Sequence, residues 1–372
     1  MTTGKEQAIG LLRSALDSAS LAAALSSPNP RVGCVITTPE GQVLGQGHTQ
    51  QAGGPHAEIM ALRDAAANGH DVRGATAYVT LEPCSHHGRT GPCCDALIAA
   101  GIARVVASIA DPNPLVAGQG FARLRAAGID VEVGPGAAES RELNIGFFSR
   151  MIRKTPWVRM KMAASLDGKT ALADGTSQWI TSDAARADGH AWRARACAVL
   201  TGIGTVLEDD PRLDVRLVST PRQPHLVVVD SRLETPLDAK LFIPGRRLWI
   251  YAAAAPAERA AALAARGAEV IVMPGSGGKV DLAAMLQDLA RREVNELHVE
   301  AGHKLNGSLI REGLVDELLV YLAPKLIGQG RDMASFGPLS ALTQAVPLDF
   351  RDIERVGDDL RIVARLRGRD DF

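Results

Sequence analysis

The stretch TLEPCSHHGRTGPC, residues 80–93, decides the fold of the N-terminal part of the chain. It overlaps an apolar run that predicts a strand over residues 76–81, and it ends where Pro92 starts a predicted helix over residues 93–100. Cys84 and Cys93, the two cysteines in this stretch, each follow a proline directly. A strand, a cysteine-bearing loop and a helix in this order indicate an α/β fold.

The alternation of strands and helices extends outward on both sides of this stretch. The hydrophobic pattern predicts helices over residues 6–25 and 55–68, and strands over residues 32–37, 43–47, 104–110 and 130–133. This order predicts a layered α/β domain with a mainly parallel sheet. The pattern stops at Gly134-Pro135-Gly136, and Lys154-Thr155-Pro156 marks a domain boundary.

A second alternation begins after this boundary. It predicts helices over residues 182–196 and 282–292, and strands over residues 157–163, 198–201, 225–230, 248–251, 269–272, 296–300 and 317–322. We therefore predict two α/β domains, residues 1–150 and residues 151–372.

Composition narrows the class of protein. The chain has 372 residues, of which 46% are hydrophobic, and a formal net charge of −1 at pH 7, so no basic surface for nucleic acid is expected. No apolar run reaches about 18 residues, and the N-terminal segment is charged where a signal peptide is apolar. Five cysteines are too few for a disulfide scaffold. We expect a cytoplasmic protein without a membrane partner.

His56-Ala57-Glu58 together with Cys84 and Cys93 forms the strongest chemical signal. A catalytic zinc takes three protein ligands and keeps one position for water, and one imidazole with two thiolates supplies that set. Glu58 is placed to move a proton from water to a leaving amine, as in zinc deaminases. The sequence therefore predicts a Zn(II) site with His56, Cys84 and Cys93 as ligands and Glu58 as the catalytic acid and base.

Two alternatives stay open at this site. Cys94 could replace Cys93 as a ligand, although a proline at the first helical position favours Cys93. His86 or His87 could fill the fourth position, which would make the site a structural zinc module serving as a binding scaffold.

The spacing of the cysteines and several further motifs point to one family. Eight residues separate Cys84 from Cys93, where cytidine and tRNA adenosine deaminases usually have two. The further motifs are PNPRVG (28–33), DPNP (111–114), SLDGK (165–169), SQWIT (177–181), DDP (209–211) and PKLIG (324–328). On these stretches, nearly the whole chain resembles the bifunctional deaminase/reductases of riboflavin biosynthesis.

The resemblance implies a fold and two activities. The fold would be a cytidine-deaminase-like α/β/α domain followed by a dihydrofolate-reductase-like α/β domain. The first would hydrolyse the ring amine of 2,5-diamino-6-ribosylamino-4(3H)-pyrimidinone 5′-phosphate. The second would reduce 5-amino-6-(5-phosphoribosylamino)uracil to the ribitylamino product with NADPH. The expected partner is thus a small phosphorylated ribosylaminopyrimidine, and we expect a homo-oligomer.

The resemblance also assigns site residues by position. The substrate of the deaminase would contact Asn29, His48, Arg89, Asp111 and Asn113, whose polar groups suit ring amines, carbonyls and a phosphate. NADPH would contact Ala163, Trp179, Thr205, Asp209, Ser231 and a glycine-containing loop of Gly302, His303, Lys304, Leu305, Asn306, Gly307 and Ser308. The substrate of the reductase would contact Lys161, Ser177, Arg193, Leu213, Arg216 and Glu300. Lys161 and Glu300 are the candidates for proton handling at the sugar.

The reductase half departs from the family at the glycine-containing loop. The family has Glu-Gly-Gly or Glu-Ala-Gly followed by Pro or Ser, whereas this chain has His303 and Lys304 after Gly302. Lys304 either supplies charge to the phosphates of the cofactor or is a solvated lysine. A Rossmann interpretation is weak, because Leu207 stands where its third glycine belongs.

Two rival functions are less well supported by the sequence. A nucleic-acid deaminase with an accessory domain would need basic charge and aromatic side chains for base stacking, but aromatics make up 4% of the chain. A chain that kept the fold but lost one activity is disfavoured, because both halves carry intact motifs.

Overall fold

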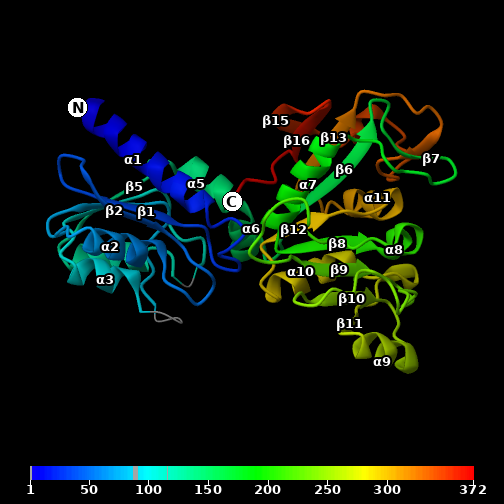
Figure 1. Cartoon of the computed structure of the whole chain (residues 1–372), viewed down its shortest axis with the longest axis horizontal. Coiled ribbons are helices and arrows are strands. Elements are labelled where there is room, and N and C mark those ends of the chain that lie inside the picture. The colour runs from blue at the N-terminus through cyan, green and yellow to red at the C-terminus, as the bar shows by residue number, and fades with distance from the viewer. Residues whose placement is uncertain (1, 87–90, 115) are drawn as a thin grey trace. The chain divides into compact units, whose positions relative to one another are not determined.

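The structure is a computed structural model that describes residues 2–86, 91–114 and 116–372. The chain divides into two compact units, Met1–Arg153 and Lys154–Phe372 (Figure 1). Each unit holds its own sheet with helices against it. No helix among the described residues is both long enough and apolar enough to cross a membrane.

The N-terminal unit is built on a five-stranded sheet with the order β2-β1-β3-β4-β5. Its strands are β1 (Gly33–Thr37), β2 (Val43–His48), β3 (Thr76–Val79), β4 (Arg104–Ala107) and β5 (Asp130–Val133). β3, β4 and β5 are parallel, but β1 is antiparallel to both β2 and β3. The sheet is therefore mixed rather than mainly parallel, because β1 and β2 form a hairpin.

Helices cover both faces of this sheet. Figure 1 shows α1 and α5 on one side and α2 and α3 on the other. The helices of this unit are α1 (Thr2–Ser20), α2 (Ala57–Ala67), α3 (Cys93–Ala99), α4 (Gln119–Ala126), α5 (Ala137–Leu143) and α6 (Ile145–Arg153). α1 ends at Ser20, five residues earlier than predicted, because residues 21–25 form turns with i to i+3 hydrogen bonds.

Glycines on β2 let α2 lie close to the sheet. A Cβ atom on Gly45 would lie 2.4 Å from the Ala61 carbonyl oxygen, and one on Gly47 would lie 2.4 Å from the Met60 Cβ atom. Both distances are below van der Waals contact, so any larger residue would push α2 away. This close packing fixes the start of α2, which carries His56 and Glu58.

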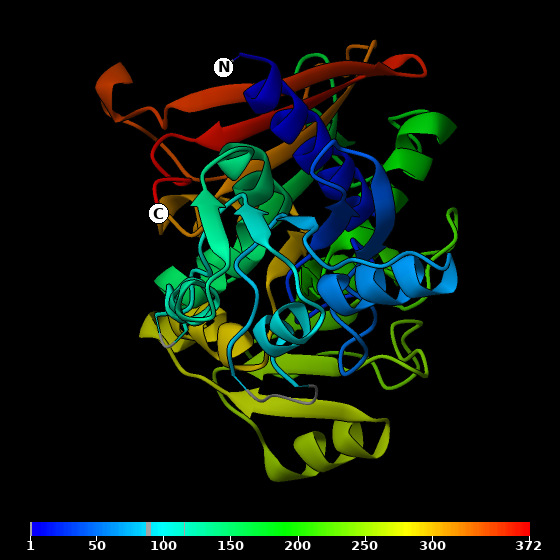
Figure 2. The same cartoon turned by 90° about the vertical axis from the view of Figure 1, so that its left-hand side faces the viewer.

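The C-terminal unit is built on a nine-stranded sheet with the order β11-β10-β9-β8-β12-β6-β13-β16-β15. Its strands are β6 (Trp157–Ser165), β8 (Ala198–Gly202), β9 (His225–Val229), β10 (Leu248–Ala252), β11 (Ala268–Val272), β12 (Glu296–Val299), β13 (Glu317–Ala323), β15 (Leu348–Val356) and β16 (Asp359–Leu366). The strands from β11 to β13 are parallel, and the β15–β16 hairpin adds antiparallel strands. Figure 2 shows this hairpin and β11 at opposite edges of the sheet.

The helices and short strands of this unit surround the carboxyl ends of the parallel strands or cover the sheet. They are β7 (Lys169–Leu172), α7 (Asp183–Arg195), α8 (Ile203–Asp209), α9 (Ala257–Ala265), α10 (Leu282–Arg291), α11 (His303–Arg311) and β14 (Gly330–Asp332). β7 and β14 pair into a separate two-stranded sheet.

The predicted glycine-containing loop over residues 302–308 is wrong as a loop, because α11 begins at His303. Leu305 and Leu309 lie one helical turn apart and pack on the core, which favours the helix. Gly307 is a site of close approach, since a Cβ atom there would lie 1.9 Å from the Ser335 carbonyl oxygen. Of residues 302–308, only Gly302 lies outside the helix, and its backbone is extended.

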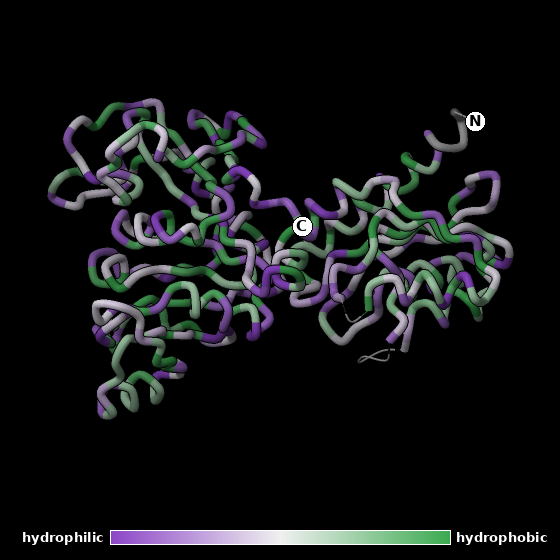
Figure 3. Tube along the Cα trace, turned by 180° about the vertical axis from the view of Figure 1, so that it is seen from behind, coloured by the Kyte–Doolittle hydropathy of each residue, from purple (hydrophilic) through white to green (hydrophobic). Residues whose placement is uncertain are grey.

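Apolar residues gather in the strands of both sheets, as the green stretches in Figure 3 show. In the C-terminal unit, one core cluster on a face of the sheet includes Met160, Leu200 and Met285. A second cluster includes Leu226, Ile250 and Leu263. Because both faces of the parallel strands are buried, their ends are the places where polar side chains can gather.

Candidate functional sites

Three side chains meet at one side of the five-stranded sheet in the N-terminal unit. His56 lies at the start of α2, Cys93 opens α3 and Cys84 lies in the loop after β3. His56 Nδ1 lies 3.5 Å from Cys84 Sγ and 3.4 Å from Cys93 Sγ. In the part of the chain that the structure describes, no other His, Cys, Asp or Glu joins this group, whose ligand atoms all lie within 4.8 Å of one another.

This geometry fits a zinc ion. With Zn–S bonds of about 2.3 Å and a Zn–N bond of about 2.05 Å, sulfur and nitrogen ligands of a tetrahedral zinc lie about 3.5 Å apart. The two distances from His56 match that value. One imidazole and two thiols leave a fourth position for water, which is the arrangement of a catalytic site.

Hydrogen bonds prepare Cys84 to act as a thiolate. The pKa of Cys84 is lowered, first by a hydrogen bond from the Cys93 thiol, with His56 adding to the effect. The Cys93 backbone N–H also donates to Cys84 Sγ, at 3.3 Å. A sulfur that accepts these bonds is favoured as a thiolate, the form in which cysteine binds a metal.

Glu58 lies in the first turn of α2, beside this group, and is 3% exposed. Burial is the main reason why the pKa of Glu58 is raised to about 7, and the neighbouring Cys84 adds to it. Its carboxylate is therefore placed, by position and by surroundings, to exchange protons near neutral pH.

The alternative ligands lie elsewhere. Cys94 is buried and donates from its Sγ to the carbonyl oxygens of Pro83 at 3.1 Å and Gly120 at 3.5 Å, away from His56. His86 is exposed and does not join the ligand group, and His87 lies outside the described residues.

The predicted substrate contacts of the deaminase come from three segments. Asn29 precedes β1, His48 ends β2, and Asp111 and Asn113 follow β4. The Asn113 backbone N–H donates to Asp111 Oδ1 at 2.8 Å, and burial raises the pKa of Asp111 to about 6. Arg89 lies outside the described residues.

Sequence reasoning missed Glu82, which lies two residues before Cys84. Glu82 is 6% exposed, and its carboxylate accepts hydrogen bonds from the backbone N–H groups of Asp111, Gly118, Gly120 and Phe121. The available signal in the sequence was an acidic residue directly after the apolar run of residues 76–81, because an acid next to a buried strand needs partners for its oxygens.

In the C-terminal unit, a cavity of about 510 Å³ opens at the carboxyl ends of β6, β8 and β12. It brings together all the predicted substrate contacts of the reductase, which are Lys161, Ser177, Arg193, Leu213, Arg216 and Glu300. Of the predicted cofactor contacts, Ala163, Trp179, Asp209 and Asn306 line this same cavity. The predicted contacts of the substrate and four of those of the cofactor therefore line one cavity.

Lys161, Arg193 and Glu300 form a charged cluster in this cavity. Arg193 donates from Nε to Glu300 Oε1 at 2.6 Å and from Nη2 to Oε2 at 2.9 Å. Its Nη1 donates to the Asp214 carbonyl oxygen at 2.5 Å. The Arg193 guanidinium is thus held by the protein on all three nitrogens. Arg216, the other predicted arginine contact, is half-exposed and pairs through Nη1 with Asp214 Oδ1 at 2.8 Å.

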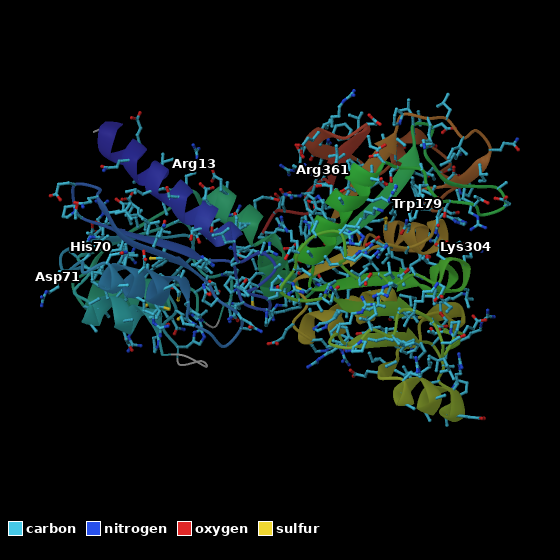
Figure 4. All side chains as sticks on the ribbon, viewed as in Figure 1. Arg13, His70, Asp71, Trp179, Lys304 and Arg361 are labelled. Atoms are coloured by element: carbon cyan, nitrogen blue, oxygen red, sulfur yellow. The ribbon has the colours of Figure 1, made fainter. Side chains whose placement is uncertain are left out.

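A second cavity, of about 910 Å³, lies beside the first and shares Thr205, Gly302 and His303 with it. It is lined by the start of α11 and by residues after β8 and β9, and it contains the predicted contacts Ser231, Lys304, Leu305 and Ser308. Figure 4 shows Trp179, from the first cavity, and Lys304, from the second, at the same end of this unit. Gly307 lines neither cavity, because it packs against Ser335.

The second cavity fits the phosphates of NADPH. The start of α11 presents backbone N–H groups and a partial positive charge, as phosphate sites at helix N-termini do. Lys279, Lys304 and Arg311 add cationic side chains to its walls, whereas Arg331 there pairs with Glu208 at 2.7 Å. A volume of this size is also in the range of cofactor sites.

Two family models match the chain. The model described as the RibD C-terminal domain matches residues 156–362, and the model of the cytidine and deoxycytidylate deaminase zinc-binding region matches residues 5–109. The two matches lie in the C-terminal and the N-terminal unit, respectively. They confirm the predicted fold class of a cytidine-deaminase-like domain followed by a reductase domain.

Relatives and solved structures match almost the full chain. Riboflavin biosynthesis protein RibD of Escherichia coli is 46% identical over 90% of this chain and 92% of its own length, and that of Aquifex aeolicus is 42% identical with the same coverage. RibD of Acinetobacter baumannii superposes with a TM-score of 0.88 at 38% identity, covering 97% of this chain and 99% of its own.

A third solved structure carries the names of both activities. It is the diaminohydroxyphosphoribosylaminopyrimidine deaminase/5-amino-6-(5-phosphoribosylamino)uracil reductase of Thermotoga maritima, with a TM-score of 0.86 at 31% identity and coverage of 98% and 99%. The chain therefore belongs to the RibD family, in which a zinc-dependent deaminase and an NADPH-dependent reductase of riboflavin biosynthesis are joined in one chain.

Proposed function

We propose that residues 1–150 form the pyrimidine deaminase and residues 151–372 form the reductase. The division into compact units after Arg153 and the positions of the two family matches support this assignment. We further propose the two substrates expected from the sequence, the diaminopyrimidinone ribosyl phosphate and then the aminouracil ribosyl phosphate. The activity names of the Thermotoga maritima relative support this choice.

In the deaminase, His56, Cys84 and Cys93 would hold the metal. When bound there, zinc would supply the activation of a water molecule for attack on the carbon that bears the ring amine. The Glu58 carboxylate accepts a proton from the water and returns it to the departing amine, a role supported by its burial beside the ligands. Asn29, His48, Arg89, Asp111 and Asn113 would hold the substrate.

In the reductase, the two adjoining cavities support the assignment of one to the substrate and one to most of the cofactor. NADPH supplies the reducing electrons. The cofactor would contact Ala163, Trp179, Thr205, Asp209, Ser231 and the residues Gly302, His303, Lys304, Leu305, Asn306 and Ser308 at the start of α11.

Proton handling at the sugar falls to Lys161 in this proposal. Burial would raise the pKa of Glu300, but Arg193, Lys161 and His298 outweigh it and hold that pKa well below its usual range. Glu300 therefore stays ionised and serves as an anchor. Burial lowers the pKa of Lys161, which makes its ammonium the readier proton donor.

One observation carries the proposal: His56, Cys84 and Cys93 come together next to Glu58. The other unit of the same chain contains the charged cavity around Glu300. The test supplies the diaminopyrimidinone ribosyl phosphate and follows ammonia release and NADPH oxidation separately. We expect ammonia without NADPH, and NADPH oxidation only after deamination, with NADPH faster than NADH. Absence of ammonia release would contradict the proposed deaminase. Equal rates with NADPH and NADH would contradict the proposed cofactor of the reductase.

The remaining expectations concern partners and location. The near-neutral net charge supports our proposal that the protein has no nucleic-acid partner. We also propose that it is a cytoplasmic homo-oligomer. Light scattering of the purified protein tests the oligomer, and a monomer at micromolar concentration would contradict it.

A further inference from the structure

We propose that Glu82 is a positioning residue of the deaminase, which fixes the Asp111–Asn113 segment relative to the metal ligand Cys84. The inference rests on the proposed function, because it takes Asp111 and Asn113 as substrate contacts. Neither Glu82 nor its partners are among the residues that the family resemblance assigned, apart from Asp111.

The Glu82 carboxylate ties together two segments. Oε2 accepts from the Asp111 N–H at 3.1 Å and from the Gly118 N–H at 2.9 Å. Oε1 accepts from the Gly120 N–H at 2.9 Å and from the Phe121 N–H at 3.3 Å. One buried side chain thus satisfies donors from the segment after β4 and from the first turn of α4.

The backbone around Glu82 is fixed as well. The Glu82 N–H donates to the Ile109 carbonyl oxygen at 3.0 Å. Pro83 accepts a hydrogen bond from Cys94 Sγ at 3.1 Å, which gives the cysteine beside Cys93 a structural role. A Cβ atom on Gly120 would lie 2.1 Å from the Pro83 carbonyl oxygen, so α4 begins in direct contact with this segment.

These contacts connect a predicted metal ligand, Cys84, with a predicted substrate contact, Asp111. Cys84 follows Pro83, and Asp111 receives its position from Glu82, so the metal ligand and the substrate contact are set by one rigid unit. Without the carboxylate, four buried or half-buried N–H groups would lose their acceptor. The Asp111–Asn113 segment would then shift, while His56, Cys84 and Cys93 would still be present.

The test replaces Glu82 by Gln in the full chain. The amide has the same size, but its NH₂ group faces two of the four N–H donors. An NH₂ group cannot accept a hydrogen bond, so the bonds to these two donors are lost. We expect KM for the diaminopyrimidinone substrate to rise about tenfold with a smaller change in kcat. Zinc content should stay at one per chain, and the reductase rate on the aminouracil substrate should not change.

Controls separate positioning from a general loss of structure. Glu40→Gln makes the same change at an exposed glutamate and should leave both activities as in the wild type. Glu82→Asp keeps the carboxylate but is one methylene too short to reach both pairs of donors, so its KM should also rise. This variant provides the test if Glu82→Gln does not fold. Because the reductase lies in the other compact unit, thermal unfolding of each variant reports on whether its N-terminal unit is folded.

Asp111→Asn, measured in parallel, distinguishes the inference from the function on which it rests. If this variant raises KM while Glu82→Gln and Glu82→Asp leave it unchanged, the positioning role of Glu82 is wrong and the proposed substrate contact stands. If Asp111→Asn leaves KM unchanged, the proposed substrate contact is wrong. Loss of zinc from Glu82→Gln would overturn the inference by assigning Glu82 to the metal site alone.

Discussion

Arg193 and Glu300 form a bidentate ion pair inside the cavity at the carboxyl ends of β6, β8 and β12, although they lie 107 residues apart in the sequence. Their side chains are 10% and 14% exposed. Lys161 from β6 lines the same cavity. The pair therefore joins α7 to the end of β12 and keeps a negative charge beside the ammonium of Lys161.

Replacing Arg193 by Leu should leave Glu300 as a buried carboxylate without its main partner. We expect the free energy of unfolding to fall by about 3–5 kcal/mol, and the reductase activity to be lost, while ammonia release by the N-terminal unit continues. Urea denaturation and the two separate assays measure this. Arg291→Leu removes an exposed arginine from Asp288, which keeps its bonds to Arg292 and Tyr251, and should cost less than about 1 kcal/mol. Equal effects of the two variants would contradict the assignment.

A buried network predicts the acid sensitivity of the fold. Arg159 donates to Glu317 at 2.5 Å and to Glu296 at 2.9 Å, and Arg365 donates to Glu317 at 2.9 Å. Burial would raise the pKa of Glu317, but Arg159 and Arg365 outweigh it and lower that pKa. Its contribution to stability is therefore complete above the unfolded pKa of about 4.3, and is lost as the pH falls through the lower folded pKa.

The measurement compares thermal unfolding of the wild type and Arg159→Met between pH 7 and pH 2.5. The variant should be less stable at pH 7, and its melting temperature should fall less steeply below pH 4, because Glu317 has lost one of the charges that lowered its pKa. Parallel pH curves for the two proteins would show that this network does not control acid unfolding.

Glu58→Gln should keep zinc and lose deamination. The ligand set of His56, Cys84 and Cys93 is unchanged, but an amide cannot accept and return a proton, so the rate of ammonia release should fall at least about a hundredfold. Metal analysis, the ammonia assay and the reductase assay on the same sample provide the measurement. Near-normal ammonia release would remove Glu58 from the mechanism.

Cysteine substitutions distinguish the ligands from their neighbour. Cys84→Ser and Cys93→Ser should lose zinc, because both sulfurs lie next to His56. Cys94→Ser should retain zinc, since the serine hydroxyl can still donate to the Pro83 carbonyl oxygen. Metal content per chain, measured after dialysis, checks this. Zinc loss from Cys94→Ser but not from Cys93→Ser would reverse the assignment.

The two units should act separately. A fragment of residues 1–153 keeps α6 whole and should bind zinc and release ammonia without NADPH, because its sheet and helices form their own compact unit. A fragment of residues 154–372 should reduce the deaminated substrate without zinc. Soluble, folded fragments that lack these activities would show that the active sites need both units.

Local patterns in the sequence determined most of the parallel strands. The predicted strand over residues 130–133 coincides with β5, and those over residues 225–230 and 317–322 differ from β9 and β13 by one residue. These strands are short apolar runs bounded by turn residues, a signal that needs no tertiary information. The zinc ligands were also identified from local sequence, Cys84 and Cys93 by the prolines before them and His56 by the glutamate two residues after it.

Only the tertiary structure decided the remainder, because it depends on contacts between distant residues. The β15–β16 hairpin was not predicted, since β15 lies at the sheet edge with most of its residues exposed and has no buried face to set a pattern. The α11 helix was not predicted, because Gly302 and Gly307 suggested a loop. Gly307 is a glycine because Ser335 packs directly against it. The bonds of Glu82 to the start of α4 and of Arg193 to Glu300 span 38 and 107 residues, and packing alone brings such partners together.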